Sequence, residues 1–522
     1  MRMLKSKLII NSNSSNSSNN SNNSNNSNNS NSSNSSNSSN NSNSSNNSIK
    51  QSSFFELSNK SNYLYNLYKS PQFKSISNLL PNIITNEFKH LLNNLYLQFK
   101  EHEPIINKIN IENSRTILSN KNAKLKIRHI LKNIFSNTRY IDNNIVNYIK
   151  TNINKCNIIS YENTINEQTF TFNFIIYDKI NIKKLNNCVK AMLLILQVII
   201  SISNNKKVPD VNKSKLCNIN GLQLNVFMTH FVKQFALDSS DVLGVRNINS
   251  GLTYPCIKTG EIYIYRKHEF FKVFIHETLH SYNVDYLLRN NYDSNTNYQS
   301  LIRTFNIANS ASSYNKIGLN ESITEFWTFI IHVFVYSYNN TPNFLKFEAY
   351  FERFYKYEVI HSYFQVAKIL YKNNLNYSQF LRPNTQMSAV LYNETSHILS
   401  YIFFKTLLVF NVNKVIKSNI FNFKLTTLDL IELDIKMSRA NPIDDLFIIL
   451  KNYSLNNDVH TIINTSYTIY KKYIALLKPL KKITFKKVPL LKLYTKKLAH
   501  NISNQNNFLL TNLNFMFIDY AI

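Results

Sequence analysis

The stretch Phe270-Phe271-Lys272-Val273-Phe274-Ile275-His276-Glu277-Thr278-Leu279-His280 decides both the fold and the chemistry of this chain. It contains the pattern His-Glu-x-x-His, and neither proline nor glycine occurs from residue 261 to residue 290. Residues four apart lie one turn apart on the same face of a helix. His276 and His280 can therefore both bind one Zn²⁺ at about 2.0–2.1 Å. Glu277 falls beside the open position of that metal, where it can accept a proton from water as a general base.

The alternative interpretation of this motif, without a metal, is a helix with two partly exposed histidines and a solvated glutamate. A second segment, Asn320-Glu321-Ser322-Ile323-Thr324-Glu325, weakens that alternative. Catalytic zinc sites usually have three protein ligands and one water, and we assign Glu321 as the third ligand of a single Zn²⁺. Glu325 lies one turn later, where it can accept a hydrogen bond from a ligating imidazole. Two carboxylates on an otherwise apolar helix need a positive partner, although an amphipathic helix with a polar stripe stays open as an explanation.

The two segments together resemble the gluzincin peptidases, the thermolysin-like group, whose pattern is HExxH followed by Asn-Glu-x-x-Ser/Thr-Asp/Glu. The resemblance covers roughly residues 245–335. The chain is dominated by Tyr, Phe, Ile, Leu, Asn and Lys, as expected for the product of an AT-biased genome. With this composition, the chain also resembles uncharacterised predicted metallopeptidases of large DNA viruses. His280 and Glu321 lie farther apart than in most gluzincins, so we expect a polar surface insertion at 290–314. The resemblance implies hydrolysis of a peptide or protein substrate by a water at the zinc ion, with Glu277 as the general base.

The gluzincin resemblance also implies a hydrogen-bond donor for the oxyanion of the tetrahedral intermediate, contributed by the C-terminal helical part. The candidates are Tyr392, His397 and Tyr401, of which we assign Tyr401. We expect His332 to be a packing residue instead of a ligand. The strand predicted at 261–266 is similar to the zincin edge strand that pairs with extended substrate, and residues 247–253 are expected to form the loop before it.

The pattern along the chain predicts an α+β fold. It consists of a zincin-like catalytic domain with a small mixed sheet and a mostly helical C-terminal part, preceded by a disordered Ser/Asn tract. Strict alternation of Phe170, Phe172 and Phe174 predicts a strand at 169–177 with one face buried. The expected parts are a low-complexity tail (1–50), an N-terminal α+β domain (51–208), the catalytic core (209–340) and a helical part with a basic tail (341–522). Helices are expected within 54–155 and at 184–202, 321–338, 345–372, 387–410 and 427–437.

Basic residues dominate the charge of the chain, with 59 Lys and Arg against 30 Asp and Glu and a formal net charge of +29. Such a charge allows contact with a polyanion through a basic surface. The segment 478–497, with eight lysines and no acid, is the strongest local example. The alternative function is therefore a non-catalytic basic protein that binds nucleic acid or builds a particle, with a vestigial or structural zinc site.

The cysteines and the longest apolar run bear on the compartment. Cys156, Cys188, Cys217 and Cys256 are isolated in sequence, which predicts buried thiols in a reducing compartment instead of a disulfide framework. The apolar run at 191–202 is too short to span a membrane and predicts a buried core helix. We therefore expect a soluble intracellular protein without a transmembrane segment, in the host cytoplasm or the virion if it is viral.

Overall fold

The computed structural model describes residues 55–520 apart from 83, 135–139, 205–216, 219, 238–239, 286–293, 309–317, 342, 382–390, 418–441 and 478–506. All the described residues belong to one compact unit, Lys50–Ile522. The predicted Ser/Asn tract, the predicted helix at 427–437 and the Lys-rich segment at 478–497 lie outside the described residues.

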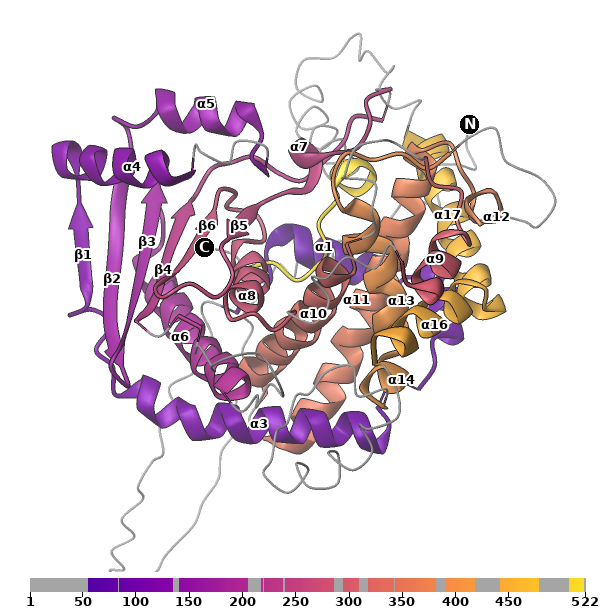
Figure 1. Ribbon diagram of the computed structural model, residues 1–522, viewed down its shortest axis with the longest axis horizontal. Helices are drawn as coiled ribbons and strands as arrows, with labels where there is room; N and C mark the ends of the chain where they lie inside the picture. The colour runs from indigo at the N-terminus through magenta and orange to yellow at the C-terminus, as the bar shows by residue number, and fades with distance from the viewer. Residues whose placement is uncertain are drawn as a thin grey trace, which may run out of the picture. The chain divides into compact units, whose positions relative to one another are not determined.

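A six-stranded mixed sheet forms the β part of the fold, in the order β1-β2-β3-β4-β6-β5 (Figure 1). Its strands are β1 (Arg115–Leu118), β2 (Asn157–Ile165), β3 (Gln168–Ile176), β4 (Gly221–Phe227), β5 (Gly251–Thr253) and β6 (Gly260–Ile264). β4 is parallel to both β3 and β6, and the other pairs are antiparallel. This arrangement confirms the predicted α+β class with a mixed sheet. The sheet crosses the boundary predicted at residues 208 and 209, because β3 and β4 are hydrogen-bonded neighbours.

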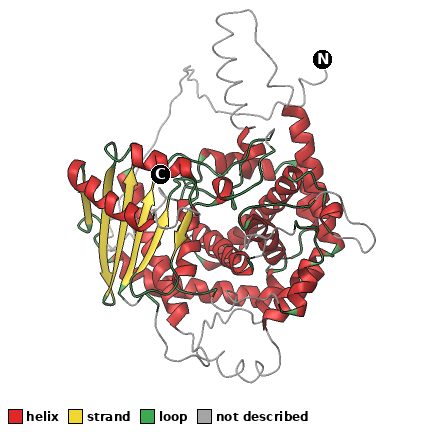
Figure 2. Cartoon of the chain, turned by 45° about the horizontal axis from the view of Figure 1, so that its top comes forward, coloured by secondary structure: helices red, strands yellow, loops and turns green. Residues whose placement is uncertain are grey.

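Helices cover both faces of this sheet (Figure 2). On one face lie α6 (Ile182–Asn204) and α8 (Phe270–Ser281), and on the other lie α4 (Asn120–Ile134) and α5 (Asn143–Thr151). The prediction that the strand at 169–177 buries one face is therefore wrong in its second half. Phe174 packs into the main core, while its neighbour Ile175 belongs to the smaller cluster beneath α4 and α5.

The helix α6 is the core helix that the apolar run predicts. Within the described residues, its Ile182–Ile202 part is the one helix long and apolar enough to cross a membrane, and 78% of its apolar window is buried. It packs against α3 and α8, and its connection from β3 to β4 is the crossover that a parallel pair of strands requires.

The rest of the described chain is mainly helical (Figure 2). Its helices are α1 (Asn59–Tyr68), α2 (Pro71–Leu79), α3 (Asn86–Asn107), α7 (Val245–Ile248), α9 (Thr296–Ile302), α10 (Leu319–Asn340), α11 (Phe344–Lys372), α12 (Tyr377–Phe380), the π-helix η4 (Ser400–Phe404), α13 (Lys405–Phe410), α14 (Val412–Lys417), α16 (Pro442–Ser454) and α17 (Asn457–Leu477). The helices predicted at 321–338 and 345–372 are confirmed as α10 and α11. Of the helix predicted at 387–410, residues 387–390 lie outside the described part of the chain. Residues 391–397 are not helical, and Tyr392 and Glu394 form bridges to Ile307 and Leu243.

The C-terminal segment, residues 508–520, passes through the core of the molecule. Its residues from Leu509 to Ile518 are all buried, and they lie against α8, α10 and α11. Buried charged side chains bind its backbone: Glu358 accepts from the N–H groups of Phe517 and Ile518 at 3.0 and 2.9 Å. The core of the helical part is thus built around a segment from the far end of the chain.

Candidate metal centre

The helix α8 places the predicted motif at the junction of the sheet and the helical part. All twelve residues of α8 are buried. The helix packs on β5, β6 and α10. Apolar residues such as Phe274 and Leu279 anchor it in the core. Because the helix is buried along its whole length, its polar residues His276, Glu277 and His280 need partners on neighbouring elements.

Helix α10 supplies the third member of the cluster. Glu321 lies in the first turn of α10, close to the positive end of the helix, where a carboxylate is favoured. His276 Nε2 and His280 Nε2 are 3.0 Å apart, and Glu321 Oε2 lies 3.3 and 3.2 Å from them. Of the described residues, these three alone form a group able to hold a metal ion.

The triangle formed by these three atoms fits a tetrahedral zinc ion. Ligands at about 2.0–2.1 Å from a tetrahedral centre lie about 3.3 Å from one another. The observed edges of 3.0, 3.2 and 3.3 Å agree with that requirement within a few tenths of an ångström. Two imidazoles and one carboxylate are also a donor set that zinc prefers in catalytic sites.

A carboxylate supports each imidazole from behind. Glu325 Oε1 lies 2.9 Å from His276 Nδ1, and Asp285 Oδ2 lies 2.9 Å from His280 Nδ1. Such contacts fix the ring orientation and direct Nε2 toward the metal position. Glu325 was predicted for this place, whereas Asp285 was missed. In the sequence, Asp285 shows only as an acidic residue shortly after the second histidine. It lies beyond the end of the helix, so helical spacing does not predict where its side chain lies.

Electrostatics at the cluster follow from its burial and its opposite charges. Burial alone would raise the pKa of Glu321, but the charges of His280 and His276 outweigh it and hold that pKa well below its usual range. Burial lowers the pKa of His280, but Glu321 and Asp285 more than offset it, so the net pKa is well above the ordinary value. Glu321 and the two imidazoles therefore each favour the charged form of the other.

Glu277 lies between the cluster and the edge strand β5. Burial, reinforced by the charge of Glu321, raises its pKa above the ordinary value. Its side chain fits against the backbone of Gly251, where a Cβ atom would lie 2.8 Å from Glu277 Oε1. A side chain at position 251 would therefore have to displace the Glu277 carboxylate or Val273.

Tyr401 is the predicted oxyanion donor that the structure brings to the site. Its ring lies 6.0 Å from that of His276, and burial followed by the charge of Glu321 raises its pKa well above the ordinary value. The phenol therefore keeps its proton and can act as a donor. Of the other candidates, His397 lines the same cleft, whereas Tyr392 is fully buried and donates to Glu394 at 2.7 Å.

His332 lies elsewhere in the core, as expected for a packing residue. Its Nδ1 lies 3.3 Å from Met516 Sδ, and burial lowers its pKa to about 3.

A cleft of about 610 Å³ opens over the cluster. Residues from the edge strand, the following turn and the segment before η4 line it: Gly251, Leu252, Thr253, Tyr254, Pro255, Thr395, Ser396 and His397, with His276, Glu277, His280 and Glu321 at the bottom. The prediction that residues 261–266 form the edge strand is wrong. β6 lies between β4 and β5, and the edge is β5, within the segment predicted to be a loop.

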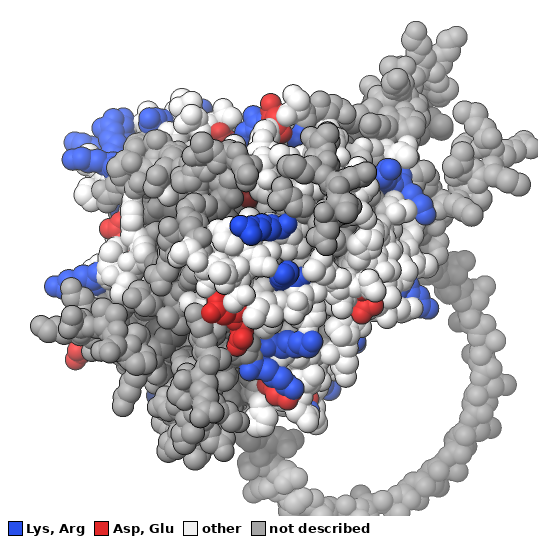
Figure 3. Space-filling view, turned by 45° about the vertical axis from the view of Figure 1, so that its right-hand side comes forward, with Lys and Arg blue, Asp and Glu red and all other residues white. Residues whose placement is uncertain are grey.

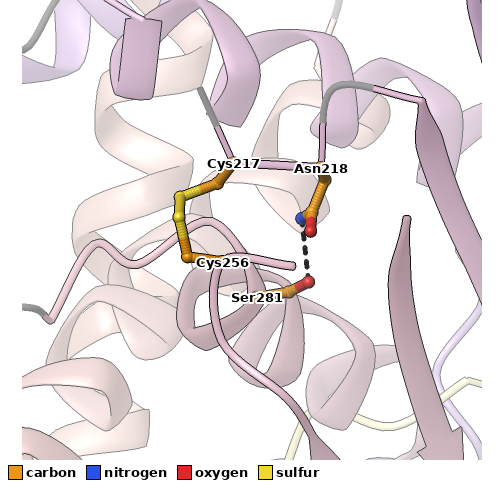
Figure 4. The surroundings of a disulfide bond; sticks show 4 residues. All are labelled: Cys217, Asn218, Cys256 and Ser281. Atoms are coloured by element: carbon orange, nitrogen blue, oxygen red, sulfur yellow. Dashed lines mark hydrogen bonds between the residues drawn. A yellow bond between two sulfur atoms is a disulfide. The ribbon is translucent and has the colours of Figure 1, made fainter. Parts of the chain in front are cut away.

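A disulfide bond joins Cys217 and Cys256, so the prediction of four free thiols is wrong for this pair (Figure 4). The two residues are 39 positions apart, and pairing of β4 with β6 brings them together. Beside the bond, Asn218 donates to Ser281 Oγ at 2.9 Å, and the Cys256 N–H donates to the Ser281 carbonyl at 2.9 Å. The turn that lines the cleft is thereby attached to the end of α8. Cys156 and Cys188 are free and buried, as predicted.

Comparison of the chain with protein-family models, with characterised proteins and with solved structures found no match.

Proposed function

We propose that this protein is a zinc-dependent peptidase of the gluzincin type. The observation that supports this most strongly is the triangle of His276, His280 and Glu321 with edges of 3.0–3.3 Å. Glu277 stands next to it, and an open cleft lies above it. Each imidazole of the triangle has its own carboxylate at Nδ1, which is typical of histidines that bind a metal.

Zn²⁺ held by His276, His280 and Glu321 would supply a Lewis acid that polarises a carbonyl and lowers the pKa of water toward 7. The residues of the chain do the rest. Glu277, whose pKa is raised by burial, accepts a proton from the attacking water and passes it to the leaving amine. Tyr401, still protonated, donates a hydrogen bond to the oxyanion as it forms.

The edge strand β5 supports the choice of a peptide as substrate. It is antiparallel to β6, and its residues line the cleft directly over Glu277. An extended peptide can add to such an edge through backbone hydrogen bonds, which place a scissile carbonyl within reach of the base. The uncharged lining that surrounds the cluster suits a neutral peptide backbone better than a phosphorylated substrate.

Substitution of Glu277 by Gln tests the proposal. The amide cannot accept the proton of water, so peptide cleavage should fall by about 10²–10⁴-fold while the zinc content stays at one per chain. Glu162→Gln, on an exposed position of β2, is the matched control and should leave both unchanged. A Glu277→Gln variant that cleaves peptide as fast as the wild-type protein would refute the mechanism.

The ligand assignment has a separate test. His280→Ala and Glu321→Ala should each lose zinc, as measured by metal analysis of the purified protein. If only His280→Ala loses it, Glu321 is not a ligand and the three-ligand site is wrong.

The alternative function is a basic protein that binds a polyanion. The net charge of +29 is the observation behind it. On the face drawn in Figure 3, described Lys and Arg side chains gather at the upper left, and elsewhere they are separated by neutral surface and by Asp and Glu. Purified protein that contains no zinc and binds DNA with a steep salt dependence would favour this alternative over the peptidase.

A further inference from the structure

A buried lysine lies behind the supporting carboxylate of the candidate metal centre. Lys272 is one turn before His276 on α8, and its side chain is 1% exposed. Its ammonium group forms an ion pair with Oε1 of Glu325, whose side chain is also 1% exposed. The same oxygen lies 2.9 Å from His276 Nδ1. One carboxylate oxygen thus joins the lysine to a ligating imidazole.

The position of Glu325 depends on what surrounds it, because a buried carboxylate is costly unless it is paired and hydrogen-bonded. His276 Nδ1 lies 2.9 Å from Oε1 of this carboxylate, and Lys272 provides the opposite charge at the same oxygen. The ammonium group is itself enclosed, since it lies 4.2 Å from the ring centroid of Phe515 in the C-terminal segment. Lys272 therefore cannot swing away into solvent, and its ion pair holds the carboxylate at one place.

We propose that Lys272 is a positioning residue of the metal centre. It holds the Glu325 carboxylate against Nδ1 of His276 and so keeps Nε2 of that ring directed at the metal. The inference rests on the proposed zinc site, and it adds a residue that the motif and its supporting carboxylates do not include. It also explains why a lysine occupies a fully buried position in the apolar first turn of α8.

A second buried pair in the same region provides a matched control. Lys233 and Glu269 form an ion pair of 2.9 Å, with side chains 1% and 0% exposed. Lys233 Nζ lies 3.7 Å from the centroid of the same Phe515 ring. Glu269, however, accepts a hydrogen bond from the backbone N–H of Met516 at 3.2 Å and does not contact a ligand. Both lysines are buried, both form an ion pair with a glutamate and both lie against the Phe515 ring. They differ in the second contact of that glutamate, which is His276 for Lys272 and the backbone of Met516 for Lys233.

The test compares Lys272→Met with Lys233→Met in the full-length protein, with zinc affinity measured by competition with a chromophoric chelator and stability measured by thermal unfolding. Both variants should be less stable. Only Lys272→Met should lose zinc affinity, by about 10–100-fold, the range for loss of a supporting partner. Lys272→Arg, which keeps the charge, should restore most of that affinity.

A thermodynamic cycle keeps the test decisive if Lys272→Met folds poorly. Glu325→Gln removes the charge that Lys272 compensates, so the double variant buries no unpaired ion. Because Lys272 acts through Glu325, its substitution should change zinc affinity less than threefold in the Glu325→Gln background. Equal zinc affinities for Lys272→Met and wild-type protein, or an equal loss in Lys233→Met, would overturn the inference. Wild-type protein that binds zinc but cleaves no peptide would instead contradict only the proposed activity.

Discussion

Gly251→Ala should disable the general base without touching the metal ligands. A Cβ atom at Gly251 would lie 2.8 Å from Glu277 Oε1, 3.0 Å from Glu277 Cγ and 2.8 Å from Val273 Cγ1. The optimal van der Waals separation of two carbon atoms is about 3.5–4.0 Å, so the carboxylate or the edge strand has to move by roughly 0.5–1 Å. The three ligand residues are absent from this set of contacts, and the metal triangle should persist.

The expected cost follows from the size of that displacement. Misplacement of a reacting group by 1 Å can lower the rate about 10²-fold. We therefore expect kcat/KM for peptide cleavage to fall by ~10–100-fold, equivalent to about 1.4–2.7 kcal/mol of transition-state stabilisation. The assay is hydrolysis of a fluorogenic peptide, with the zinc content determined on the same preparation.

The effect of Gly251→Ala should disappear when Glu277 is already Gln, because both changes act on the same proton transfer. A further tenfold loss in that background would mean that the alanine disturbs the edge strand or the substrate. Retention of activity within threefold of wild type would refute the close-approach argument altogether.

Other parts of the structure lead to further predictions. Asp285→Ala should weaken zinc binding by about 10–100-fold, since His280 would lose the carboxylate at its Nδ1, and a chelator titration would reveal an unchanged affinity if this is wrong. Burial raises the pKa of Glu394 from its ordinary value of 4.5 to about 8 in the folded protein. Between pH 4.5 and 8 the folded protein therefore keeps a proton on Glu394 that the unfolded chain has lost. Stability should therefore fall by up to about 1.4 kcal/mol per pH unit from pH 4.5 to 8, and Glu394→Gln should flatten this slope in urea unfolding. The Cys217–Cys256 disulfide joins residues 39 positions apart, and its reduction should lower the free energy of unfolding by about 4 kcal/mol. An unchanged melting temperature in dithiothreitol would contradict this.

Local patterns were sufficient to predict the elements that carry the cluster. The spacing of His276 and His280 predicts one face of a helix, and α8 has that form. The apolar segment that follows Glu321 likewise forms α10, and the alternating phenylalanines form β3. Each of these signals depends on residues a few positions apart, whose spacing follows directly from helix or strand geometry.

Features that depend on pairing between distant segments were not accessible in this way. The edge strand β5 has three residues, one of them glycine, so it shows no alternation, and only its hydrogen bonds to β6 identify it. Cys217 and Cys256 become neighbours because β4 pairs with β6, and isolated cysteines carry no signal of that pairing.

The residues that surround the candidate metal cluster likewise depend on contacts between distant segments. Asp285 reaches His280 through a turn beyond the end of α8, and Lys272 reaches Glu325 across the contact between α8 and α10. Phe515 reaches both buried lysines from the far end of the chain. Motif spacing thus predicts the residues of the candidate metal site. The charged residues that support them depend on long-range packing, because packing determines which groups lie beside a buried ion.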